Sequence, residues 1–124
     1  MNKWLLVFIG GGIGTAVRYG TALAAGRLLG TGFPWGTLMV NLGGCFMIGI
    51  VLALAEKTSL VPPATRLFFV TGFLGGLTTF SSYAMESVMA FRSGMAMALA
   101  NIALNNLAGL ALVVAGLKLT EQLL

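Results

Sequence analysis

The sequence contains no histidine and no aspartate, and its 124 residues include a single cysteine, Cys45. Catalytic triads that use His and Asp, metal sites built on His, and paired aspartates are therefore excluded. A lone cysteine within a hydrophobic segment carries no information about redox compartment, and we interpret it as a small packing residue. We expect no enzymatic activity.

Charge is also scarce, since charged side chains make up 8% of the chain and hydrophobic ones 58%. With a mean hydropathy of +0.99, the chain has too little polar surface to cover a water-soluble globule, and we expect it in membrane lipid. The net charge of +4 is the excess of seven Lys and Arg residues over three Glu residues, and the cations occur singly along the chain. This scatter is typical of charges at membrane boundaries, so we expect no nucleic-acid partner.

Long uninterrupted apolar runs favour membrane-spanning helices over a closed barrel, the other fold that satisfies its backbone in lipid. A span needs roughly 20 residues to cross a hydrocarbon core of about 30 Å, so the chain holds at most four. The sequence predicts an all-α integral membrane fold, a single four-helix domain over residues 1–124, with an up-down arrangement. The predicted spans are residues 4–26, 35–55, 67–91 and 95–117.

The beginning of the first span imitates a signal peptide, with Lys3, an apolar stretch and the small run Ala22-Leu23-Ala24. Three consecutive glycines from Gly10 and the charge of Arg18 would spoil a secretory core. We therefore predict an uncleaved span.

The cations are almost evenly divided between the two sides of the membrane if the spans alternate. One side would hold four and the other three, namely Lys3, Lys57, Arg66 and Lys118 against Arg18, Arg27 and Arg92. So small a bias gives little orienting force, which predicts insertion both ways round and an antiparallel homodimer. The alternative is a single orientation decided by one lysine.

The third span is interrupted between Gly75 and Ser82 by two adjacent glycines and four hydroxyl residues near the bilayer centre. A discontinuous helix there would expose helix ends and free carbonyls, which bind ions. Small residues also permit close helix packing in membranes. From the spacing alone both interpretations remain open.

Carboxamides occur in two other spans. Asn41 lies in the second span with Thr37 one turn earlier, while the fourth span contains Asn101, Asn105 and Asn106. An amide in hydrocarbon needs a partner, which is either a neighbouring helix or a permeating ion. Three amides in one span are more than packing usually requires, although helix-to-helix bonding remains an explanation for any one of them.

The remaining polar and aromatic groups in the spans are mostly hydrogen-bond donors or ring edges. Arg18 either snorkels to a boundary or lines a water-filled vestibule, and Glu86 is the only acid within a span. Phe80 and Tyr83 share a helical face and present positive ring edges, although core packing is the preferred explanation of that spacing taken alone. A cation route would be expected to show several carboxylates, so this inventory indicates an anion.

Three stretches carry a resemblance to a known family. They are Gly10-Gly11-Gly12-Ile13-Gly14 leading to Arg18, then residues 36–44 (Gly-Thr-Leu-Met-Val-Asn-Leu-Gly-Gly), and residues 72–82 (Gly-Phe-Leu-Gly-Gly-Leu-Thr-Thr-Phe-Ser-Ser). On these the chain resembles the bacterial CrcB/Fluc fluoride channels over essentially its whole length.

The resemblance implies a dual-topology homodimer with two fluoride pores along the interface and a structural Na⁺ on the two-fold axis. It implies that the main-chain carbonyls of Gly75 and Thr78 bind this Na⁺. The implied pore residues are Asn41, Phe80 and a hydroxyl track of Thr79, Ser81 and Ser82, with Thr37 and Tyr83 alongside. Tyr83 departs from the phenylalanine that many members have. In the fourth span, Asn106 is the preferred match to a polar pore position, ahead of Asn105.

The implied function is passive export of cytoplasmic fluoride, which lowers its toxicity, by a multi-pass protein of the bacterial cell (inner) membrane. The main alternative is a small multidrug-type proton-coupled cation exporter, which needs a carboxylate in the first span that this chain lacks. A structural assembly subunit is a second alternative, but it would need no helix break and no buried amides.

Overall fold

The computed structural model describes residues 2–124, and this part of the chain consists of helices and short loops. Four helices are long and apolar enough to cross a membrane, as predicted: Lys3–Leu29, Trp35–Lys57, Pro63–Ala90 and Met95–Leu123. Most of them extend beyond the predicted spans. The largest extension is at the end of the fourth helix, because amphipathic residues continue the helix after the apolar run ends.

The first two helices are α1 (Lys3–Leu29) and α2 (Trp35–Lys57), and each is continuous. The third comprises α3 (Pro63–Arg66), the π-helical stretch η1 (Leu67–Leu74), α4 (Gly75–Leu77) and α5 (Phe80–Ala90). The fourth comprises α6 (Met95–Ala103), a second π-helical stretch η2 (Leu104–Ala108) and α7 (Gly109–Leu123).

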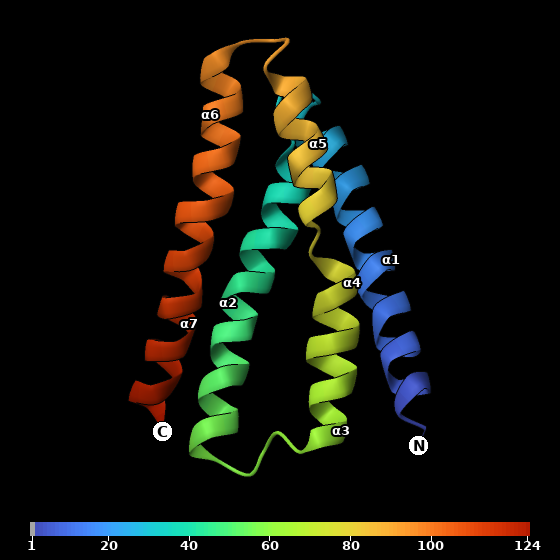
Figure 1. Ribbon diagram of the computed structural model, residues 1–124, viewed down its shortest axis with the longest axis vertical. Coiled ribbons are helices and arrows are strands. Elements are labelled where there is room, and N and C mark those ends of the chain that lie inside the picture. Colours follow the sequence, from blue (N-terminus) through green and yellow to red (C-terminus); the bar gives the residue numbers. More distant parts are fainter. Residues whose placement is uncertain (1) are drawn as a thin grey trace.

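Consecutive helices run in opposite directions (Figure 1). Both chain ends and the loop between α2 and α3 lie at one end of the bundle, and the loop between α5 and α6 lies at the other. The most extensive packing joins α2 to α7, and α1 to η1. The predicted up-down order is therefore present.

Glycines bring these paired helices into backbone contact. A Cβ atom on Gly10 or Gly14 of α1 would collide with a carbonyl oxygen of η1, belonging to Phe68 or Phe73. A Cβ atom on Gly49 would likewise meet the Val113 carbonyl across the contact between α2 and α7. Small residues thus serve close packing here, as they commonly do between membrane helices.

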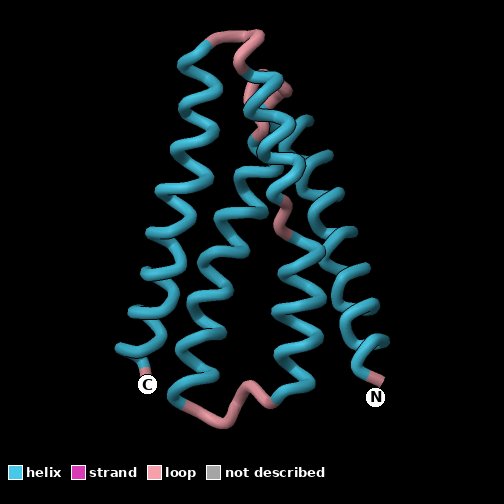
Figure 2. Tube along the Cα trace, in the orientation of Figure 1, coloured by secondary structure: helices cyan, strands magenta, loops and turns pink. Residues whose placement is uncertain are grey.

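The third helix is broken between α4 and α5, which Figure 2 shows as a loop in the middle of the bundle. Thr78 has φ −84° and ψ 154°, and Thr79 has φ −150° and ψ 114°, so both residues are extended. The prediction of a discontinuous helix is confirmed in this geometry. Close packing by Gly76, whose Cβ atom would meet the Gly11 carbonyl, occurs at the same place, so the two interpretations were not exclusive.

Candidate functional site

Asn41 of α2 holds the break through its side chain. Its Oδ1 accepts a hydrogen bond from the Thr79 N–H at 2.8 Å, and its Nδ2 donates to the Thr79 carbonyl at 3.2 Å. One carboxamide therefore bonds to both main-chain groups of the extended residue that caps α5.

The break removes the usual helical donors of several main-chain carbonyls, including those of Gly75 and Thr78. In a continuous helix the Thr79 N–H would bond to the Gly75 carbonyl, and the Ser82 N–H to the Thr78 carbonyl. Instead the Thr79 N–H donates to Asn41, and the Ser82 N–H donates to Thr79 Oγ1 at 3.2 Å. The carbonyls of Gly75 and Thr78, predicted as cation ligands, are thus among those whose usual donors are diverted.

Arg18 reaches the break from α1. Its Nε donates to the Gly76 carbonyl at 2.9 Å, 58 residues away in the sequence. The Arg18 side chain thereby provides a hydrogen-bond donor for another carbonyl next to the break. The two roles considered from the sequence, snorkelling to a boundary and lining a vestibule, did not include this contact. A guanidinium at this point also places positive charge near the middle of the bundle.

Both candidate amides of η2 reach the site. Asn105 Oδ1 accepts from Asn41 Nδ2 at 2.9 Å, whereas Asn106 Nδ2 donates to the Tyr83 hydroxyl at 2.8 Å. Because successive residues turn through a smaller angle in a π-helix than in an α-helix, these neighbours approach the same side of the bundle. Sequence reasoning preferred one of them, but the π-helical stretch that brings both to the site has no clear signature in the sequence.

The predicted hydroxyl and aromatic residues lie together at the start of α5. Thr79 Oγ1 lies 3.1 Å from Ser82 Oγ and 3.5 Å from Ser81 Oγ. The rings of Phe80 and Tyr83 pack edge to face with centroids 5.4 Å apart, and Phe80 is 76% exposed. Of these residues, Thr79, Phe80 and Tyr83 border a cavity of about 420 Å³ that opens on the surface of the chain, together with Asn41, Asn105 and Asn106. Ser81 and Ser82 do not line it.

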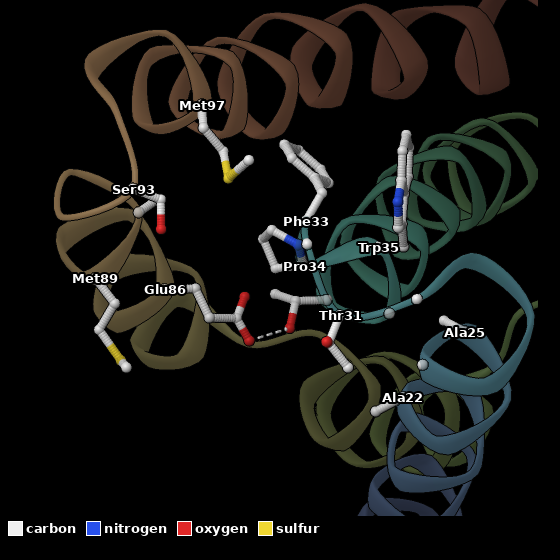
Figure 3. A pocket seen from close by; sticks show the side chains of 16 residues that line it. Ala22, Ala25, Thr31, Phe33, Pro34, Trp35, Glu86, Met89, Ser93 and Met97 are labelled. Carbon is white, nitrogen blue, oxygen red and sulfur yellow. Dashed lines mark hydrogen bonds between the residues drawn. The ribbon is translucent and has the colours of Figure 1, made fainter.

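A second cavity of about 410 Å³ lies at the end of the bundle where α1 ends and α2 begins. The Thr37 hydroxyl donates to Glu86 Oε1 at 2.8 Å, the bond drawn beside Glu86 in Figure 3. Glu86 Oε2 is buried and has no hydrogen-bond partner among residues 2–124. Thr37 is one helical turn from Asn41, so the two cavities lie on the same face of α2. No sequence pattern indicates that Thr37 and Glu86, which are 49 residues apart, form a hydrogen bond.

The sequence of the chain is similar to those of known proteins. A family model described as "CrcB-like protein, Camphor Resistance (CrcB)" matches residues 5–117. Three relatives are each named "Fluoride-specific ion channel FluC". The protein of Rhizobium etli is 45% identical over 98 residues (79% of this chain, 78% of the relative), and that of Chlorobium phaeobacteroides is 49% identical over 94 residues (76% and 72%). The protein of Azobacteroides pseudotrichonymphae is 41% identical over 122 residues, which are 98% of each chain.

Proposed function

The chain belongs to the CrcB family as a multi-pass bacterial membrane protein, and from this premise we propose that it is a passive, fluoride-selective channel. Relatives that bear the name of a fluoride channel align with nearly its whole length. The observation that carries the proposal is the mid-bundle break, where an amide and several hydroxyls border one cavity. A proton-coupled cation exporter gains no support, because α1 contains no acid.

Fluoride loses strong hydration when it enters a narrow path, so it needs donors that replace water. Asn41 Nδ2 is such a donor, and its 3.2 Å bond to the Thr79 carbonyl is the longer of its two bonds. An anion that takes this proton leaves the shorter bond to Asn105 intact. The proposed path continues past hydroxyls and ring edges at the start of α5, with Asn106 opposite and Thr37 one turn along α2. These groups belong to Thr79, Ser81, Ser82, Phe80 and Tyr83.

The carbonyls of Gly75 and Thr78 are the proposed ligands of a structural Na⁺. They fit a hard cation, because both are neutral oxygen ligands whose helical donors are diverted to Asn41 and Thr79. Two carbonyls from each of two copies would supply four oxygens. A bound Na⁺ would make the local potential favourable for an anion, and Arg18 adds to it from the opposite side of the break.

An antiparallel homodimer is the proposed assembly. Phe80 is 76% exposed on the single chain, and the Asn106 side chain is exposed beside it. Polar side chains that face hydrocarbon are costly, so a second copy is the expected cover for this surface. A two-fold axis in the membrane plane would bring two breaks together at the centre of the membrane.

Passive flux in this setting would protect the cell by exporting fluoride. Neutral HF crosses lipid from an acidic medium and dissociates in the more alkaline cytoplasm, which traps the anion. A channel that admits fluoride and excludes larger halides lets the trapped ion leave without dissipating other gradients.

The deciding experiment is fluoride efflux from liposomes containing the purified protein, measured with a fluoride electrode, with chloride efflux as the control. We expect fluoride release without chloride release. Asn41→Asp places a negative charge beside the Thr79 carbonyl and removes the donor, so we expect release to fall to the level of empty liposomes. Unchanged fluoride efflux from this variant would remove Asn41 from the path, and absence of efflux from the wild type would refute the channel itself.

A further inference from the structure

A chain of hydrogen bonds connects the interior of the bundle to the break. Ser87 Oγ donates to the Tyr83 carbonyl at 2.8 Å and accepts from Asn101 Nδ2 at 2.9 Å. Asn105 Nδ2 donates to Asn101 Oδ1 at 3.0 Å, and Asn105 Oδ1 accepts from Asn41 at 2.9 Å. The chain thus crosses from α5 through α6 and η2 to α2.

The direction of every bond in this chain is forced by its two ends. The Tyr83 carbonyl only accepts, so the single Ser87 proton points to it, and Ser87 Oγ must accept from Asn101. The oxygen of Asn101 then faces the amide nitrogen of Asn105, whose own oxygen faces Asn41 Nδ2. At the far end the Thr79 N–H only donates, and it meets Asn41 Oδ1 at 2.8 Å. Both ends therefore require the same orientation of every amide.

Water does not compete for the inner links. Asn101 is 0% exposed and Ser87 is 5% exposed, so reversing either side chain would leave donors facing donors in a buried site. The buried part of the chain therefore holds its own orientation and transmits it to the partly exposed part, in addition to the contacts that Asn41 makes with Thr79.

We propose that Ser87 and Asn101 are positioning residues that fix which way the Asn41 carboxamide faces. The inference rests on the proposed function, since it assigns the Nδ2 side of Asn41 to fluoride. With the relay intact, the second Nδ2 proton points to the Thr79 carbonyl at the edge of the cavity. A reversed carboxamide would present its oxygen at that place, where it repels an anion, and would withdraw the acceptor from the Thr79 N–H.

The test uses two substitutions of the same shape. Ser87→Thr keeps the hydroxyl and Ser87→Val replaces it with a methyl group, so their difference isolates the relay from the added volume. Thr120→Val is the matched control, because Thr120 is also buried and its hydroxyl donates to the carbonyl one turn earlier, Gly116, at 2.8 Å. Ser87→Ala repeats the loss of the hydroxyl without added volume, should both larger side chains prevent folding.

Two measurements are made on each purified full-length variant: fluoride efflux from liposomes, and deuterium exchange of the Thr79 main-chain amide. We expect Ser87→Val to accelerate Thr79 exchange and to slow fluoride efflux, each by about tenfold, which corresponds to about 1.4 kcal/mol. Ser87→Thr should stay close to the wild type in both, and so should Thr120→Val.

Wild-type exchange at Thr79 in Ser87→Val and Ser87→Ala would overturn the positioning role. Equal losses in Ser87→Val and Ser87→Thr, with Ser87→Ala unaffected, would also overturn it, because volume and not the hydroxyl would then be responsible. Failure of the wild type to release fluoride would instead refute the proposed function, and the exchange measurement would still decide whether Ser87 orients Asn41.

Discussion

At the scale of single residues, the break is maintained by side chains that replace lost helical hydrogen bonds. Asn41 bonds to both main-chain groups of Thr79, Arg18 bonds to the Gly76 carbonyl, and Thr79 Oγ1 caps the new helix at Ser82. A buried main-chain group without a partner costs about 1–3 kcal/mol, so each of these contacts removes a substantial penalty. The carbonyls of Gly75 and Thr78 receive no such side-chain donor from residues 2–124 and are the proposed ligands of Na⁺.

The Na⁺ proposal is tested by changing the ion, since substitution of side chains leaves main-chain ligands in place. An ion that binds only the folded protein raises its stability with concentration. We expect the thermal unfolding midpoint, measured in detergent by circular dichroism, to rise with NaCl. Protein purified and heated in KCl or choline chloride of equal ionic strength is the control. Equal midpoints in all three salts would argue against a Na⁺ site.

The residues of the site were easier to predict from the sequence than their partners. An amide, hydroxyls and paired glycines inside apolar runs are conspicuous, so Asn41 and the break were predicted. The bonds of Arg18 to Gly76 and of Thr37 to Glu86 join residues 58 and 49 positions apart. Such pairings depend on how the helices cross, which periodicity along one chain does not specify. Ser87 was missed for the same reason, because a serine within a span is unremarkable until Asn101 is seen beside it.

At the scale of helices, glycines set the distances on which the site depends. Gly14 of α1 lies against the Phe73 carbonyl. Gly76 in turn lies against α1, close to the Gly11 carbonyl and the Thr15 main-chain nitrogen. This close contact brings Arg18 within reach of the break. Gly44 of α2 plays a similar part, since a Cβ atom there would collide with the methyl group of Thr78.

Gly14→Ala should therefore destabilise the protein, and Gly12→Ala should not. A Cβ atom on Gly14 meets main-chain atoms that cannot rotate away, whereas one on Gly12 meets no atom within 4 Å. We expect Gly14→Ala to cost about 1–3 kcal/mol, as overpacking typically does. Gly12→Ala should be neutral or stabilise the helix by up to about 1 kcal/mol. Thermal unfolding of both variants in the same detergent is the measurement, and equal destabilisation would show that the contact with η1 is not specific.

At the scale of the whole molecule, the charges at the two ends of the bundle bear on its orientation in the membrane. The end with both chain termini carries Lys3, Lys57, Arg66 and Lys118, and the other carries Arg27 and Arg92. Arg18 was counted toward the second end from the sequence, but its bond to Gly76 holds it at the break. The comparison is therefore four cations against two, still a weak orienting bias, and insertion both ways round remains a proposal.

The proposed antiparallel homodimer is tested by two variants whose added cations favour opposite orientations in the membrane. Thr65→Lys with Gln122→Lys adds two cations to the terminal end, and both positions are exposed. The opposing variant combines Lys3→Gln, Arg66→Gln and Lys118→Gln with Leu28→Lys and Leu29→Lys, both at exposed positions, which leaves one cation at that end against four at the other. Each should insert in one orientation, which a reporter fused to the C-terminus would reveal.

A population inserted in one orientation contains no antiparallel partner, so each variant alone should lose fluoride efflux by at least about tenfold. Co-expression supplies both orientations and should restore efflux toward the wild-type level, which neither substitution set achieves by itself. Restoration distinguishes this cause from damage to the pore, because damage in either variant would persist in the mixed pair. Full efflux from one variant confined to a single orientation would show that two parallel copies, or one copy alone, complete the path past Asn41.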